Sequence, residues 1–121
     1  MKIMKNPFIF VKDQTPEIAL AAVRQDGLNL KYVKVQTPEI CEAAASQNGK
    51  SLKYVKDQTE AICVAAVTQS PKAIIYVKDQ TPAICLAAVR GDGSVLKYVR
   101  EQTPEIALAA VEQSNNNKVK K

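Results

Sequence analysis

The strongest constraint on this chain is a repeat of 22 residues that continues through most of its 121 positions without an insertion or a deletion. A valine and a glutamine recur at every step: Val11, Val33, Val55, Val77 and Val99, and Gln14, Gln36, Gln58, Gln80 and Gln102. A fixed period of this length is typical of stacked repeat proteins, in which each unit covers the apolar side of its neighbour. We therefore interpret residues 1–121 as a single repeat domain. Its units are 6–27, 28–49, 50–71, 72–93 and 94–115, followed by a polar tail, 116–121, that we expect to be mobile.

The second half of each unit predicts an α-helix. Thr15 suits the N-cap, Pro16 the first helical position, and Glu17 the first turn, where the helix dipole favours a carboxylate. The third unit has Thr59 followed by Glu60, which keeps the cap and loses only the rigid first turn. A glycine or a proline lies just beyond each of the first four helices: Gly27, Gly49, Pro71 and Gly93. At this place we expect glycine to adopt the left-handed conformation that ends many helices, and Pro71 to act as a stop.

The first half of each unit, such as "LNLKYVKVQ", is predicted to be a second helix. Leu30 and Val33 are one helical turn apart, with Lys31 and Lys34 together on the opposite side. Because tyrosine and valine favour strands, a strand followed by a helix is the alternative. The leucine spacing of such strand-containing repeats is missing from all five units. The predicted fold is all-α, a short α-solenoid of five 22-residue helical hairpins.

The recurring segments "LKYVK", "QTPEIC", "AAV" and "QNG" or "QDG" carry a resemblance. Over residues 6–115 the chain resembles a tandem helical repeat family of unknown function, found in bacteria, some eukaryotes and giant viruses. The resemblance implies an array of helical hairpins. It implies no activity, cofactor or site residue.

Several kinds of chemistry are disfavoured. The chain has no histidine, the usual general base near neutral pH and a common metal ligand, and its four glycines form no phosphate-binding loop. Cys41, Cys63 and Cys85 occupy one place in successive units, and alanine takes that place in the outer units. We interpret them as small core residues, with no metal site and a reducing compartment. The tyrosines align with Phe10, so we also assign these rings to the core. We predict no catalytic residue, no cofactor and no enzymatic activity.

The net charge of +5 comes from the ends of the chain. Lys2 and Lys5 precede the repeats and Lys118, Lys120 and Lys121 follow them, which leaves a neutral repeat body. The sequence contains no apolar run long enough to cross a membrane, so we expect a cytoplasmic protein without a membrane partner.

Two surfaces are candidates for binding. Varied positions on the second helices, called the α-surface here, suggest recognition of a protein partner: Glu17, Leu20, Arg24, Glu42, Val64, Thr68, Leu86, Arg90, Leu108 and Glu112. Basic residues on the first helices, the basic ribbon, suggest nucleic acid as the alternative: Lys31, Lys34, Lys53, Lys56, Lys78, Lys97 and Arg100. We expect a non-enzymatic protein-binding module, either an adaptor or an inhibitor of a larger protein. Because Ile9 stands where three units have lysine, the first unit is expected to be capped by residues 1–5 or to form a homodimer.

Overall fold

The structure, a computed structural model, describes the backbone of residues 6–119 and the side chains of residues 6–116. Short 3-10 helices (η) and α-helices alternate along it: η1 (Pro7–Phe10), α1 (Pro16–Gln25), η2 (Gly27–Tyr32), α2 (Pro38–Gln47), η3 (Gly49–Tyr54), α3 (Glu60–Gln69), η4 (Pro71–Tyr76), α4 (Pro82–Gly91), η5 (Gly93–Tyr98) and α5 (Pro104–Val119). The predicted N-terminal cap, residues 1–5, and the last two residues of the predicted tail lie outside the described residues. Helix α5 continues into the first part of that tail.

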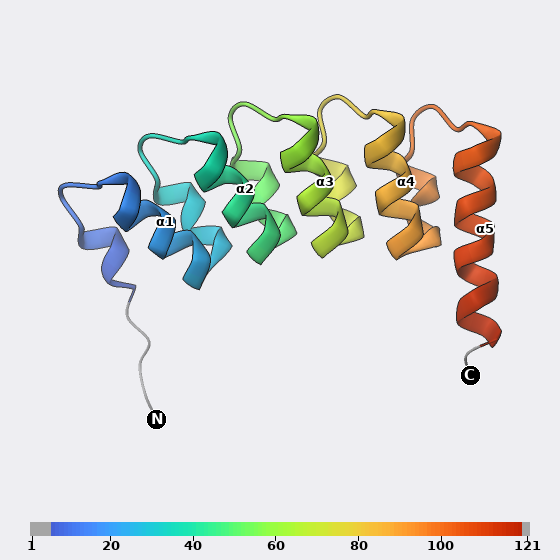
Figure 1. Cartoon of the computed structure of the whole chain (residues 1–121), viewed down its shortest axis with the longest axis horizontal. Coiled ribbons are helices and arrows are strands. Elements are labelled where there is room, and N and C mark those ends of the chain that lie inside the picture. Colours follow the sequence, from blue (N-terminus) through green and yellow to red (C-terminus); the bar gives the residue numbers. More distant parts are fainter. Residues whose placement is uncertain (1–5, 120–121) are drawn as a thin grey trace.

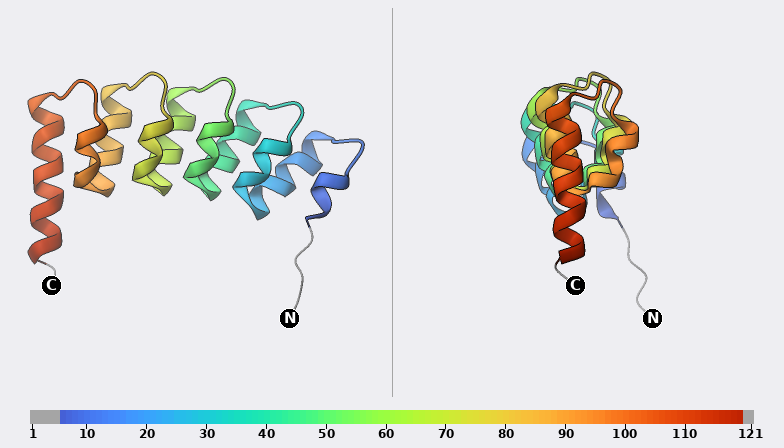
Figure 2. Two further views of the ribbon diagram at one scale, coloured as in Figure 1. Left: turned by 180° about the vertical axis from the view of Figure 1, so that it is seen from behind. Right: turned by 90° about the vertical axis from the view of Figure 1, so that its right-hand side faces the viewer.

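The helices form two layers (Figure 1). The α-helices stand side by side in one layer, and the 3-10 helices form the other. Each of η2 to η5 packs against the α-helix before it and the α-helix after it, and each α-helix packs against the next. The loops that lead into the α-helices all lie along one edge of the array, here called the loop edge (Figure 2). The described residues contain only helices and connecting segments, so the all-α prediction is confirmed and the strand alternative is wrong.

The α-helices begin as the sequence predicts. The Thr15 hydroxyl accepts a hydrogen bond from the amide of Ile18 at 3.2 Å, which satisfies one of the free donors of the first turn. The equivalent threonine does the same in every unit, and Thr59 keeps this bond although Glu60 replaces the proline. Cap and proline together fix where each α-helix starts, and therefore the direction in which the α layer runs.

The predicted first helix of each unit is helical but tighter than an α-helix. In η2, the amide of Asn29 donates to the carbonyl of Asp26 at 2.9 Å, and Val33 donates to Leu30 at 3.0 Å. These i to i+3 bonds give three residues per turn, so Leu30 and Val33 lie on the same side and are both buried. Valine, isoleucine and tyrosine lose side-chain freedom in an α-helix, and six residues make too few α-type hydrogen bonds to compensate.

A single hydrophobic cluster runs through all five units. Each internal unit contributes a leucine or isoleucine of the 3-10 helix and the alanines, isoleucine and cysteine of the α-helix. Cys41, Cys63 and Cys85 are buried, as predicted. Burial raises the pKa of each thiol, and a nearby carboxylate, Asp57 for Cys41 and Asp79 for Cys63, raises it further. Arg100 partly opposes the effect of burial on Cys85. The thiols therefore remain protonated near neutral pH and act as packing groups.

Two polar side chains are buried beside this cluster, at one repeat position. The Asn29 amide donates to the carbonyl of Ala22 at 2.9 Å and accepts from the Asn6 amide at 2.6 Å. Ser51 occupies the same place one unit later, and its hydroxyl has no hydrogen-bond partner. The next unit has Ala73 there. The fifth unit has buried Val95, so the position accepts polar and apolar side chains alike.

The glycines between α- and 3-10 helices have a different role from the one predicted. Within the described residues no glycine has a positive φ, so the expected left-handed helix end is wrong. A Cβ on Gly27 would instead collide with the carbonyl oxygen of Ala44 in the next unit, and Gly49 and Gly93 are in the same position. Glycine is required here because two units approach closely.

The same glycines link neighbouring units through their amides. The amide of Gly27 donates to the side-chain oxygen of Gln47 at 2.6 Å, and equivalent bonds join Gly49 to Gln69 and Gly93 to Gln113. Pro71 replaces the glycine between the third and fourth units and has no amide hydrogen to donate. There the glutamine is replaced by Gly91, and a Cβ on Gly91 would lie 2.7 Å from Cγ of Pro71. We predicted that Pro71 stops a helix. In the structure it begins η4.

At the loop edge a glutamine joins each unit to the next. The side-chain amide of Gln58 donates to the carbonyl of Tyr76 at 2.8 Å, and its oxygen accepts from the amide of Lys78 at 3.0 Å. Gln14, Gln36 and Gln80 make the equivalent pair of bonds. Gln102, in the last unit, instead donates to the carbonyl of Leu96 in its own unit at 3.3 Å. These glutamine clamps explain why glutamine recurs at this position, and they fix the spacing between units.

Candidate interaction surfaces

The α-surface is more polar in the structure than its sequence suggests. Most of its residues are exposed: Glu17, Arg24, Glu42, Thr68, Arg90, Leu108 and Glu112. Leu20, Val64 and Leu86 are half-buried and pack against the core. Leu108 is different, because 58% of it is exposed. Apolar contact with a partner on this side therefore depends mainly on Leu108.

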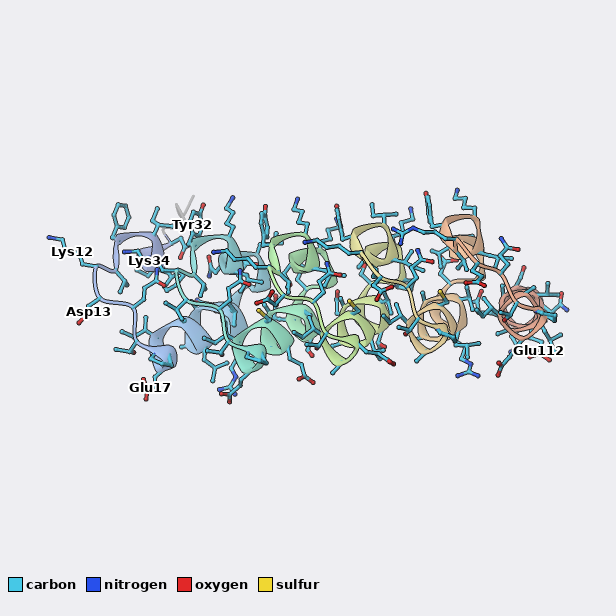
Figure 3. All side chains as sticks on the ribbon, turned by 90° about the horizontal axis from the view of Figure 1, so that it is seen from above. Lys12, Asp13, Glu17, Tyr32, Lys34 and Glu112 are labelled. Atoms are coloured by element: carbon cyan, nitrogen blue, oxygen red, sulfur yellow. The ribbon has the colours of Figure 1, made fainter. Side chains whose placement is uncertain are left out.

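The C-terminal part of the α-surface lines a hollow between α4 and α5. Its volume is about 260 Å³, and Arg90, Leu108 and Glu112 contribute to its walls together with Glu105 and Gln113. The structure thus brings together three of the predicted residues around one concave site. Glu17 and Glu112 lie at opposite ends of the α layer, so the α-surface as a whole is long and is not a single pocket (Figure 3).

The basic ribbon lies on the other layer. All seven of its residues are exposed. The guanidinium of Arg100 donates to the carbonyls of Val77 and Lys78 at 3.0 Å, so this side chain also holds the fourth and fifth units together. The segments 28–34, 50–56, 72–78 and 94–100 contain lysine and arginine and no acidic residue. Four of the α-helices, α1, α2, α3 and α5, carry glutamates, whereas α4 has none, so the α layer is on the whole the more acidic of the two.

The assignment of the aligned rings to the core is wrong for Phe10, Tyr32 and Tyr98, whereas Tyr54 and Tyr76 do pack against the core. Phe10 is 71% exposed, Tyr32 and Tyr98 are about 40% exposed, and Tyr54 and Tyr76 are half-buried. The ammonium groups of Lys31, Lys53 and Lys97 lie 5.0, 5.2 and 5.3 Å from the ring centroids of the tyrosines that follow them. This is the geometry of a cation–π contact. The recurring Lys-Tyr pair was the sequence signal for an exposed ring, because a core position would not have a lysine folded over it.

A row of clefts along the loop edge was not predicted. A cleft of about 410 Å³ lies between the loops that precede α3 and α4 and is lined by Lys56, Asp57, Glu60, Lys78 and Asp79, among others. Related clefts of about 320 and 340 Å³ lie between the loops preceding α4 and α5 and those preceding α1 and α2. Their walls mix both charges with the glutamine clamps. Within the described residues, no group of three or more acidic, cysteine or histidine side chains is arranged to hold a metal ion.

Both ends of the array expose apolar side chains that internal units bury. Ile18 of α1 is 38% exposed, whereas Ile40, the same residue one unit later, is 2% exposed. At the other end Val111 of α5 is 53% exposed, whereas Val89 is fully buried. Ile9 of η1 is 47% exposed, but Ile75 at the same position of an internal unit is 52% exposed, so stacking does not bury this position.

The comparison with known families is consistent with the expected family of unknown function. Residues 15–60 match the model of a domain of unknown function, DUF4116. This segment contains α1, η2, α2 and η3. No curated protein and no solved structure matches the chain. Among the described helices, none has the length and the apolar composition needed to span a bilayer.

Proposed function

We propose that the chain is a short α-solenoid of five helical units that binds another protein through its α-surface, without enzymatic activity of its own. In this role it acts as an adaptor or as an inhibitor of a larger protein. Repeat arrays present extended surfaces on which successive units can vary while the packing positions are kept.

The observation that carries the proposal is the position of the sequence variation. The clamp glutamines, cap threonines and buried isoleucines repeat from unit to unit and hold the units together. The residues that differ on the α-helices, such as Glu42, Thr68 and Arg90, are exposed. The position of Arg24, Thr68 and Arg90 is exposed in each of these units and does not contribute to unit packing, so its variation is free to follow a partner. The hollow lined by Arg90, Leu108 and Glu112 is the most defined site on this side.

Nucleic acid is the second candidate, and the charge separation between the layers favours it. A basic face attracts phosphates, and binding of this kind weakens steeply with salt because counterions are released. The clamped, evenly spaced units would place successive lysines of the basic ribbon along a phosphate backbone.

Affinity capture at low and at moderate salt, from cells that make the protein, separates these two functions. Leu108→Glu is the test variant because Leu108 is exposed, so its replacement leaves the core intact. Val35→Glu is a matched control, since Val35 is 74% exposed in the loop before α2, outside the α-surface. We expect one protein partner that survives moderate salt and is lost with Leu108→Glu only. Recovery of nucleic acid alone, abolished by Lys34→Glu with Lys56→Glu, or a partner lost with Val35→Glu only, contradicts the proposal.

We also propose that the first unit self-associates through the exposed side chains of Ile9 and Phe10. Exposed apolar residues at the end of a repeat array favour contact with a second copy. Sedimentation velocity over a range of concentrations tests this. We expect Ile9→Lys to shift the equilibrium toward monomer, and a wild-type protein that remains monomeric throughout rules the association out.

A further inference from the structure

One repeat position forms a row of exposed side chains along the layer of 3-10 helices. We call it the outer row: Ile9, Lys31, Lys53, Ile75 and Lys97. Every member is exposed, and the two isoleucines are about half exposed. Because the units are fixed by the glutamine clamps, the row has a constant step. Its order is apolar, basic, basic, apolar, basic.

The lysines of the outer row are held in place by aromatic rings. Each ammonium group lies 5.0 to 5.3 Å from the ring centroid of the next residue, and that of Lys53 is also 6.0 Å from the ring of Tyr76 in the following unit. A long lysine side chain normally loses considerable rotational freedom when it binds a ligand. Here the contact with a ring restricts that freedom in advance, which favours binding of an anion.

The local charge selects an anionic partner. No acidic residue occurs in the segments 28–34, 50–56, 72–78 and 94–100, which carry the outer row in the second to fifth units. The nearest acidic residues in the sequence are those of the connecting loops, Asp57 and Asp79 among them, and the N-cap residues of η2 and η5, Asp26 and Asp92. The row is therefore complementary to carboxylates or phosphates.

Two features favour a peptide over a nucleic acid. Base stacking requires a free aromatic face, and a lysine ammonium group already lies over one face of each of Tyr32, Tyr54 and Tyr98. A phosphate backbone also carries charge at every step, whereas Ile9 and Ile75 interrupt the charge of the row with apolar surface. A peptide can match such a mixed pattern, since each of its residues can be acidic or apolar.

We propose that the outer row binds an extended acidic peptide segment whose apolar and acidic residues match Ile9, Lys31, Lys53, Ile75 and Lys97 in order. Neighbouring packed helices are about 8–10 Å apart. An extended chain in the polyproline II conformation rises about 3.1 Å per residue and turns every third side chain to the same face. One unit therefore corresponds to about three peptide residues, and the row to about 13. This surface lies on the layer opposite the α-surface, so it is a second site and does not depend on binding through the α-surface. It shares Ile9 with the proposed self-association of the first unit and its lysines with the basic ribbon.

The probe is a fluorescent synthetic peptide of about 13 residues. It has leucine at the first and tenth positions, glutamate at the fourth, seventh and thirteenth, and glycine or serine elsewhere. A second peptide carries the same pattern in the reverse direction, because the row does not fix the direction of the chain. Fluorescence anisotropy with the full-length protein measures the affinity. We expect one of the two directions to bind, with a dissociation constant below about 1 mM.

Two sets of variants test the recognition. Lys31→Glu with Lys53→Glu is expected to weaken binding by at least about tenfold. Lys50→Glu with Lys72→Glu is the matched control, since it removes the same charge from exposed positions of the same layer outside the row. Ile75→Lys makes the fourth position of the row basic. The wild type should prefer the probe over a peptide in which the leucine facing Ile75 is replaced by glutamate, and the variant should prefer the second peptide. Circular dichroism confirms that each variant remains folded.

Three outcomes overturn the proposal. The first is that neither peptide binds below about 1 mM. The second is equal weakening by the test pair and the control pair, which indicates attraction by net charge alone. The third is tighter binding of a single-stranded oligothymidine, weakened by the same row variants, which assigns the surface to nucleic acid. None of these results bears on the effect of Leu108→Glu, so failure here is distinguishable from failure of the α-surface proposal.

Discussion

Replacing Gly91 by glutamine should destabilise the protein, although glutamine is the better helix former by up to about 1 kcal/mol. Gly91 is the last residue of α4, where the other internal α-helices have a glutamine. In those units the glutamine accepts a hydrogen bond from a glycine amide of the preceding unit. Between the third and fourth units the partner is Pro71, which has no amide hydrogen.

The size of the effect follows from the contact with the proline ring. A Cβ at position 91 lies 2.7 Å from Cγ of Pro71, closer than real Cβ contacts. Overpacking of this kind usually costs about 1–3 kcal/mol, which exceeds the gain in helix propensity. We expect Gly91→Gln to lower the free energy of unfolding by about 1–2 kcal/mol.

Pro71→Gly should also destabilise the protein. Glycine gives the unfolded chain more conformational freedom than proline does, which lowers the free energy of unfolding by about 0.4–1 kcal/mol. The change also adds an amide with no acceptor opposite Gly91. A free amide at this close approach costs about 1–3 kcal/mol. The double variant restores both members of the Gly-Gln pair found at the other interfaces, so its loss should be smaller than the sum of the two.

Urea unfolding followed by circular dichroism measures all four proteins of this double-mutant cycle. We expect a coupling free energy of at least about 1 kcal/mol in favour of the pair. The reasoning is refuted if Gly91→Gln is neutral or stabilising, or if the two changes are additive.

The remaining predictions concern stability and pH. Ser51→Ala should raise the free energy of unfolding by about 1 kcal/mol in urea titrations, because it removes a buried hydroxyl without a partner; a loss of stability would show that the hydroxyl is satisfied. Gln58→Ala should cost about 1–3 kcal/mol by breaking two bonds between units, whereas Gln102→Ala, which breaks one bond within its own unit, should cost under about 1 kcal/mol. Equal losses in the two alanine variants would contradict the clamp. Because burial raises the pKa of the three thiols, folding favours their neutral form, and this contribution is present below the ordinary pKa of 9.0 and is lost as the pH rises toward the higher folded-state values. Above pH 9.0 the melting temperature should therefore fall more steeply with pH for the wild type than for a variant with alanine in place of Cys41, Cys63 and Cys85. Parallel curves of melting temperature against pH would contradict this.

Local rules predicted the α-helices well. The Thr-Pro start is a short-range signal, since the threonine hydroxyl and the amide that it caps are three residues apart, as in Thr15 and Ile18. The burial of the cysteines was also predictable, because alanine replaces them in the outer units. The helix starts are therefore set within one unit, whereas the burial of the cysteines was inferred by comparing units.

The errors concern contacts between units. The role of Gly27 depends on Ala44 and Gln47, about one repeat away, so its fit to a helix-end rule was misleading. The exposure of Tyr32 is an exception, because it arises from the tight turn of η2 within a single unit. The clefts at the loop edge arise only when loops from neighbouring units come together. Periodicity predicts that units stack, but it does not specify which atoms meet.

Pro71 and Gly91 stand where the other interfaces have a glycine-glutamine pair, and this difference also affects how the array can bend. The other interfaces are fastened at both edges, by a glutamine clamp at the loop edge and by a glycine amide at the opposite edge. Between the third and fourth units only the clamp of Gln58 remains. We therefore expect the array to bend most readily at this interface, with the clamp as its pivot. Opening there would rotate the first three units as one block against the last two, and would change the step of the outer row between Lys53 and Ile75 while leaving the spacing within each block unchanged.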